Sequence, residues 1–132
     1  MMITKTYISK FNNKILFNAW VSTQMIIPPI TKIEVDLKIG GKFILSAESS
    51  NGTSKMVGEF LEIINEQKLK YVWYWEGSDE KTNVTVLFNY EDNENKISII
   101  HEGFLTKESA EMHSTGWDHY FTELDNLLSN NE

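Results

Sequence analysis

Three histidines are the residues of this sequence best suited to acid–base chemistry, because imidazole exchanges a proton near neutral pH. His101 is in phase with Ile97 and Ile99 of an alternating segment, which predicts that its side chain points inward. His113 lies on the apolar stripe of the last segment, whereas His119 lies off that stripe. Two interpretations stay open for His101 and His113: they orient or shuttle protons for a polar ligand group, or they are packed side chains bonded to neighbours.

Aromatic residues indicate a second kind of site, one for a small apolar molecule. They concentrate on one face of residues 68–76 and along the segment that follows Thr106. Aromatic side chains with polar atoms, lining an apolar concavity, are typical of small-ligand sites. The alternative is that the rings fill the core, and residue types alone do not decide between the two. The candidate ligand-binding residues are Trp20, Tyr71, Trp73, Trp75, His101, His113, Trp117 and Tyr120.

The sequence lacks the residue patterns of metal sites, nucleophilic catalysis and nucleotide binding. The sequence has no cysteine, no HExxH pattern and no acidic cluster at ligand spacing, so we expect neither a metal nor a thiol nucleophile. No serine lies in a Gly-x-Ser-x-Gly elbow, and Gly40-Gly41 lacks the context of a nucleotide-binding loop. We therefore expect no cofactor and no catalytic residue. A cyclase or hydratase that uses the two inward histidines stays an alternative.

Composition limits the partners. The 132 residues carry 12 basic residues, all lysine, against 19 acidic ones, for a net charge of −7. This balance disfavours nucleic acid and an anionic membrane surface as partners. No stretch has the length and apolarity of a membrane span or a signal peptide. We expect one domain over residues 1–132, located in the cytoplasm, either as a monomer or as a homodimer.

The elements that position these residues follow from hydrophobic periodicity. Asn12 or Asn13 begins a short helix that runs to about Trp20, and Thr106 caps an amphipathic helix of about twenty residues. Period-two alternation predicts strands joined by short polar turns, which favours an antiparallel meander. The predicted strands cover residues 4–9, 31–39, 43–47, 56–64, 68–76, 83–90 and 96–102.

Four stretches of this sequence, in order, resemble the START-related, birch-pollen-allergen-like (SRPBCC) superfamily. Within it, the sequence is most similar to homologues of the activator of Hsp90 ATPase. The stretches are Phe-Asn-Ala-Trp at 17–20, Asp-Leu-Lys-Ile-Gly-Gly-Lys-Phe at 36–43, Gly-Glu-Phe-Leu-Glu-Ile at 58–63 followed by Leu-Lys-Tyr-Val-Trp-Tyr-Trp at 69–75, and His-Ser-Thr-Gly-Trp at 113–117. The resemblance implies an α+β helix-grip fold. Its curved antiparallel sheet of six to seven strands would wrap a long C-terminal helix, with two short helices after the first strand.

The resemblance and the aromatic residues together predict that a hydrophobic or amphipathic small molecule binds between the sheet and the last helix. The alternative is a co-chaperone-like interaction module that contacts a chaperone or another protein through its surface. Gly116 is expected to allow close packing of the helix on the sheet. The acidic residues of the helix are expected to form a solvated face, or to dock a basic partner: Glu108, Glu111, Asp118, Glu123 and Asp125.

Overall fold

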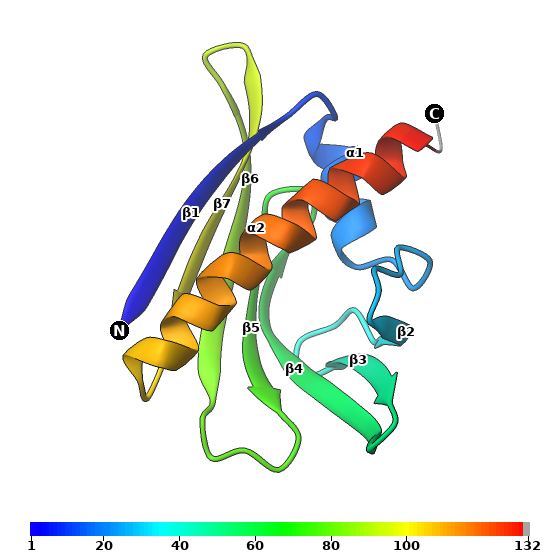
Figure 1. Ribbon diagram of the computed structural model, residues 1–132. Helices are drawn as coiled ribbons and strands as arrows, with labels where there is room; N and C mark the ends of the chain where they lie inside the picture. The colour runs from blue at the N-terminus through cyan, green and yellow to red at the C-terminus, as the bar shows by residue number, and fades with distance from the viewer. Residues whose placement is uncertain (131–132) are drawn as a thin grey trace.

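A curved antiparallel sheet and a long C-terminal helix, α2 (Lys107–Asn130), form the two layers of the molecule (Figure 1). The computed structural model describes residues 1–130. Over these residues the sheet has seven strands in the order β1-β7-β6-β5-β4-β3-β2. This architecture confirms the expected helix-grip fold. The other elements are β1 (Met2–Ser9), α1 (Asn13–Trp20), β2 (Ile30–Val35), β3 (Lys42–Ser49), β4 (Gly52–Ile64), β5 (Lys68–Trp75), β6 (Thr82–Glu91) and β7 (Glu94–Glu102).

The sheet is a meander because short turns join consecutive strands from β2 to β7, and neighbours in sequence therefore pair in space. β1 closes the order by pairing with β7, where Tyr7 lies opposite Ile97. In β4 the pairing register shifts between Phe60 and Glu62, a bulge that bends the strand. The sheet thus curves around α2 and presents a concave face to it (Figure 1).

Both helices begin where the sequence predicts. The side chain of Asn12 accepts a hydrogen bond from the Ile15 amide, and Thr106 accepts one from the Ser109 amide. In residues 1–130, however, one helix rather than two follows β1, so the expectation of a helix pair is wrong. The connection between α1 and the next strand contains Pro28 and Pro29. Proline disfavours helix both at its own position and at the residue before it.

The strand expected over 31–39 is shorter than its alternation suggests. β2 ends at Val35, and the chain then turns, so that the side chains of Leu37 and Ile39 are 44% and 63% exposed. The Lys38 amide bonds to the Asp36 carbonyl, and Gly40 has a φ of +82°. A Cβ atom on the following glycine would overlap the Asp36 carbonyl oxygen. Gly40 and Gly41 thus belong to a tight turn that begins before the apolar alternation ends.

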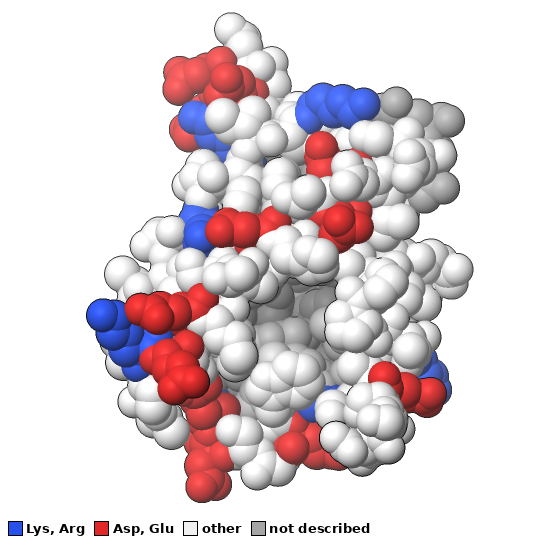
Figure 2. Space-filling view, in the orientation of Figure 1, with Lys and Arg blue, Asp and Glu red and all other residues white. Residues whose placement is uncertain are grey.

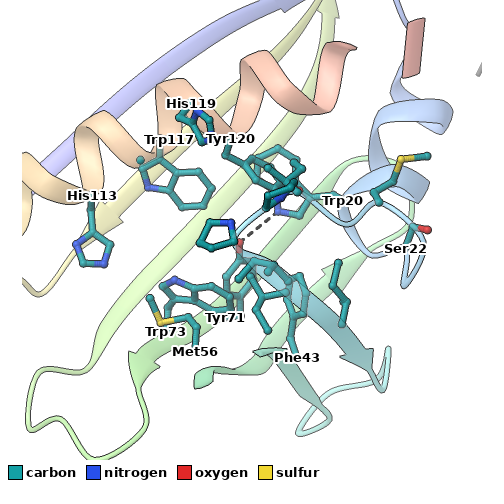
Figure 3. Close-up of a pocket in the computed structure, with 18 of the residues that line it drawn as sticks. Trp20, Ser22, Phe43, Met56, Tyr71, Trp73, His113, Trp117, His119 and Tyr120 are labelled. Carbon is teal, nitrogen blue, oxygen red and sulfur yellow. Dashed lines mark hydrogen bonds between the residues drawn. The ribbon is translucent and has the colours of Figure 1, made fainter. Parts of the chain in front are cut away.

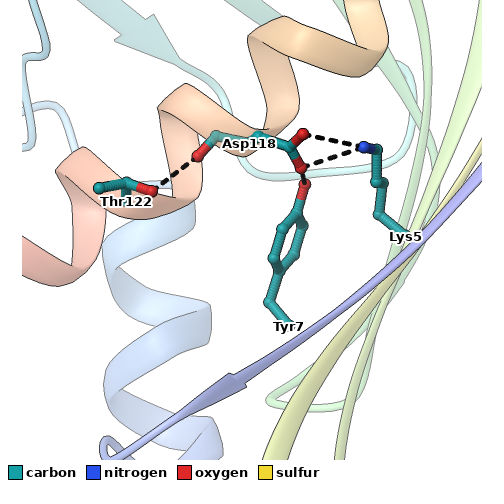
Figure 4. A network of polar contacts seen from close by, with 4 residues as sticks. All are labelled: Lys5, Tyr7, Asp118 and Thr122. Carbon is teal, nitrogen blue, oxygen red and sulfur yellow. Dashed lines mark hydrogen bonds and ion pairs between the residues drawn. The ribbon is translucent and has the colours of Figure 1, made fainter.

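Polar contacts hold α2 against the β1 edge of the sheet (Figure 4). The Asp118 carboxylate accepts hydrogen bonds from the Lys5 ammonium at 3.0 Å and from the Tyr7 hydroxyl at 2.7 Å. About two turns further on, Asp125 accepts a hydrogen bond from the Ser9 hydroxyl at 3.0 Å. These two acidic residues are therefore not part of a purely solvated face, because they fasten the helix to β1.

The packed core lies under the C-terminal half of α2, where Leu124 and Leu128 belong to the same buried cluster as Leu16 and Phe17 of α1. The sheet contributes alternate inward residues of its central strands, such as Val86 and Ile97, which are fully buried. Within the described residues, neither helix combines the length and the apolarity that crossing a bilayer requires. The N-terminal half of α2 lies over a cavity instead of over this core.

Candidate functional site

A cavity of about 330 Å³ lies between the N-terminal half of α2 and the half of the sheet formed by β2 to β5 (Figure 3). The end of α1 and the chain from Ser22 to Ile30 close one side of it. Its walls are mainly apolar, with aromatic side chains from α1, from α2 and from the sheet. Interiors of this size of domain are normally packed with few voids larger than a water molecule, so the space is a distinct feature of the fold.

Seven of the eight candidate ligand-binding residues line this cavity, and the eighth, His101, does not. The seven are Trp20, Tyr71, Trp73, Trp75, His113, Trp117 and Tyr120. All four tryptophans of the sequence are therefore among the lining residues. The structure brings the candidates together around one space, and their role in binding stays a prediction.

Strand alternation in β5 explains how three of the aromatic residues reach the cavity. Tyr71 and Trp73 are almost fully buried on the concave face, and Trp75, at the end of the strand, is 41% exposed at the margin. Gly58 of β4 lies directly beneath Trp73, and a Cβ atom there would stand 2.9 Å from the indole ring. The absence of a side chain at Gly58 therefore leaves room for the Trp73 ring in the cavity wall, a role that the sequence analysis did not assign to this glycine.

Trp20, the last residue of α1, forms the back wall between the core and the cavity. Its ring stacks on Trp117 of α2 at 5.8 Å between centroids and meets Tyr120 edge-on at 4.9 Å. Its indole N–H donates a hydrogen bond to the Tyr71 hydroxyl at 3.2 Å. One aromatic cluster thus ties α1, α2 and β5 together and holds the wall rigid.

His101 lies behind Trp117 and belongs to a chain of hydrogen bonds rather than to the cavity wall. The Trp117 indole N–H donates to Nδ1 of His101 at 3.0 Å, and Nε2 lies 2.7 Å from the Thr82 hydroxyl. That hydroxyl donates to the Trp73 carbonyl oxygen at 2.7 Å. Because an indole N–H only donates and a carbonyl only accepts, the hydrogen of His101 is on Nε2.

The surroundings of His101 keep it neutral. Its side chain is fully buried, and this burial, together with the nearby His113, lowers the pKa of His101 to about 3. Both ring nitrogens are engaged, so His101 has the features of the packed interpretation. The expectation that it faces a ligand does not match this placement, because strand phase predicts an inward side chain but not what covers it.

His113 and His119 approach the cavity from α2. Nδ1 of His113 donates to the Ser109 carbonyl at 2.8 Å, which leaves Nε2 without a partner among residues 1–130. His119, which the sequence places off the apolar stripe, is exposed and lines the outer part of the cavity. The stripe predicted from the sequence was too narrow, because Met112, Gly116 and His119, which lie along one side of it, also border the open space.

Gly116 also faces the cavity, which corrects the expectation of close packing. A Cβ atom at this position would meet no atom within 4 Å. Sequence reasoning missed several other lining residues that come from the loop after α1 and from β2 to β4: Ser22, Met25, Ile27, Pro28, Pro29, Ile30, Ile33, Phe43, Leu45 and Met56. The alternation of Phe43 and Leu45 was the one available signal, whereas the loop residues carry no periodic pattern.

The arrangement is suited to holding an apolar molecule. Across residues 1–130, no group of three or more histidine, cysteine, aspartate or glutamate side chains is placed to bind a metal ion. The polar side chains at the wall carry hydroxyl, indole and imidazole groups, which are able to form hydrogen bonds.

Comparison with known proteins places this fold in a family. The family model described as Activator of Hsp90 ATPase homolog 1-like protein matches residues 10–129. An HSP90 activator from Plasmodium falciparum is 24% identical, with a TM-score of 0.78 over 98% of this chain and 96% of that chain. A protein of unknown function from Staphylococcus aureus is 14% identical, with a TM-score of 0.82 over 99% of this chain and 94% of that chain.

Structural likeness at such identities establishes the fold alone. No curated protein matches the sequence. The family model, by contrast, spans most of the chain and confirms the resemblance noted in the four motifs. The chain belongs to the family of Activator of Hsp90 ATPase homolog 1-like proteins.

Proposed function

We propose that this protein binds one hydrophobic or amphipathic small molecule in the cavity between α2 and the sheet. The observation that carries this proposal is an open space of about 330 Å³ lined by every tryptophan of the chain. An empty apolar cavity destabilises a protein, because its lining atoms lose contacts that a filled core supplies. A ligand restores those contacts and removes its own apolar surface from water.

The polar atoms of the wall support an amphipathic ligand. The hydroxyl groups of Tyr71 and Tyr120 and the Nε2 atom of His113 are distributed over the sheet side and the helix side of the cavity. Such isolated polar groups orient a molecule that apolar contact holds. We do not propose catalysis by His101, because both of its ring nitrogens are already hydrogen-bonded.

Titration with N-phenyl-1-naphthylamine, an uncharged dye that fluoresces in apolar surroundings, tests the proposal. We expect saturable binding of one dye molecule per chain, with quenching or energy transfer from the tryptophans that line the site. In Gly116→Phe, the added ring occupies open space at the cavity without meeting another atom at its Cβ, and dye binding should be lost.

The matched control is Thr115→Phe, which adds the same ring one residue away, at an exposed position that does not line the cavity. It should bind the dye as the unmodified protein does. Circular dichroism checks that both variants fold. The proposed function is wrong if folded Gly116→Phe binds the dye as tightly as Thr115→Phe. It is also wrong if neither the unmodified protein nor either variant binds the dye saturably.

A second candidate is contact with a chaperone, which the likeness to the Plasmodium falciparum HSP90 activator favours. On this proposal the protein acts through its surface and raises the ATPase rate of purified Hsp90. The effect should persist in Gly116→Phe, because this proposal does not involve the cavity at which the added ring lies. An unchanged ATPase rate over a wide range of added protein would contradict this second candidate.

A further inference from the structure

The titratable side chains of the cavity wall are tyrosines and two histidines, His113 and His119. Among the described residues that line it, there is no lysine, aspartate or glutamate. Figure 2 shows the hollow bordered mainly by side chains other than lysine, aspartate and glutamate, with acidic and lysine side chains on the surface around it. A ligand with an ionised carboxylate or ammonium group would therefore be buried without a lysine, aspartate or glutamate side chain as its counter-charge, which costs far more than burying its neutral analogue. An anion would in addition meet the field of a chain whose net charge is −7.

The hydrogen-bonding atoms of the wall include two phenol groups with hydrogens to donate. The Tyr71 hydroxyl accepts a hydrogen bond from Trp20, and no residue in 1–130 accepts its own hydrogen. The Tyr120 hydroxyl has no hydrogen-bond partner within the same residues. Burial raises the pKa of both tyrosines, so both phenols stay protonated. They are available to a ligand atom that accepts hydrogen bonds.

The shape of the wall favours a flat ligand. Trp73 lies on the sheet side of the space and Trp117 on the helix side, as Figure 3 shows, and both present large planar rings. Planar rings gain most from contact with other planar rings, in stacked or edge-on arrangements. The volume, about 330 Å³, is at the small end of ligand pockets, so it admits one compact molecule.

We propose that the cavity selects an uncharged, flat ring compound whose oxygen atom accepts hydrogen bonds from the hydroxyl groups of Tyr71 and Tyr120. The inference rests on the proposed function and gives the chemical class of its ligand. Apolar contact with the rings supplies affinity, and the two hydroxyl groups select the oxygen. The wall, which has no lysine, aspartate or glutamate, disfavours the ionised analogue of the same size.

Three compounds that share one ring system test this proposal: 2-acetylnaphthalene, 2-naphthoate and naphthalene. The first is neutral with a carbonyl acceptor, the second is an anion at neutral pH, and the third has no acceptor. Dissociation constants are measured by isothermal titration calorimetry. We expect 2-acetylnaphthalene to bind about tenfold more tightly than 2-naphthoate, because the anion loses its hydration at a wall that has no lysine to pair with it. It should also bind about tenfold more tightly than naphthalene.

Tyrosine variants test whether the hydroxyl groups cause the preference for 2-acetylnaphthalene over naphthalene. Tyr120→Phe removes a hydroxyl without a protein partner, so folding should be unaffected while the preference for 2-acetylnaphthalene over naphthalene falls. The double variant with Tyr71→Phe should abolish that preference, measured as the ratio of the two dissociation constants within the variant, because Tyr71→Phe also removes the acceptor of the Trp20 indole and can change the affinity for both compounds. If 2-naphthoate binds as tightly as 2-acetylnaphthalene, the inference of an uncharged ligand is wrong.

The remaining outcomes separate the inference from the proposed function. If both tyrosine variants keep the full preference for the carbonyl compound, the assignment of the hydroxyl groups is wrong. Binding of N-phenyl-1-naphthylamine without binding of any of the three naphthalenes overturns the ligand class and leaves the proposed function standing. If the protein binds neither the dye nor any of the three naphthalenes, the proposed function is wrong as well.

Discussion

Replacing His101 by glutamine tests the hydrogen-bonded chain behind Trp117 through the pH dependence of stability. In the folded protein the pKa of His101 is lowered to about 3, chiefly by burial, from an ordinary value of 6.5. Below the ordinary value, the unfolded chain binds a proton that the folded chain does not bind. Acid therefore favours unfolding, and stability falls as the pH falls from the ordinary value toward the folded one.

The magnitude follows from the size of the shift. One pKa unit corresponds to about 1.4 kcal/mol, so acidification from neutrality to about pH 5 should cost the folded protein about 2 kcal/mol through His101 alone. Glutamine has an amide N–H for the Thr82 hydroxyl and an oxygen for the Trp117 indole, but it does not titrate. His101→Gln should therefore be less stable at neutral pH by about 1 kcal/mol and lose less stability in acid.

Urea unfolding followed by circular dichroism, at neutral pH and at about pH 5, measures both quantities. His119→Gln is the control, because His119 is exposed and has no hydrogen-bond partner among residues 1–130. It should keep the acid sensitivity of the unmodified protein. Equal losses of stability in His101→Gln and His119→Gln between the two pH values would refute the reasoning, since His101 would then not be a buried neutral group.

Three further substitutions have expected outcomes that the same unfolding assay checks. Gly116→Ala should stabilise the protein by up to about 1 kcal/mol, because alanine favours helix and its Cβ meets no atom within 4 Å; a loss of stability would indicate hidden packing. Gly58→Ala should destabilise it by about 1–3 kcal/mol, because the new Cβ presses on the Trp73 ring. The same variant should weaken dye binding, and unchanged dye affinity would contradict the role given to this glycine. Asp118→Asn should lower the unfolding midpoint, because it removes the ion pair with Lys5, and an unchanged midpoint would show that this contact is not needed to hold α2.

Much of the fold was predictable because its signals are local. The caps Asn12 and Thr106, the alternation within strands and the short polar turns depend only on residues close in sequence. The errors arose where a local pattern met a non-local constraint. Leu37 continues the alternation of β2, yet a turn bonded through Asp36 ends that strand.

The candidate site was predictable as a set of residue types but not as a space. Face assignment in β5 and the helical stripe of α2 brought Tyr71, Trp73, Trp117 and Tyr120 together correctly. The loop from Ser22 to Ile30 was missed because its residues have no period to indicate a face.

From the sequence alone followed the order of elements, the family and the aromatic character of one face, because periodicity, caps and motifs are carried by neighbouring residues. Only the tertiary structure decided that the space between α2 and β2–β5 is open, that Gly116 faces it and that His101 lies behind Trp117. The physical reason is that cavity volume and side-chain partners depend on how far apart two layers settle. That separation is a balance of contacts between residues distant in sequence, such as Asp118 with Lys5.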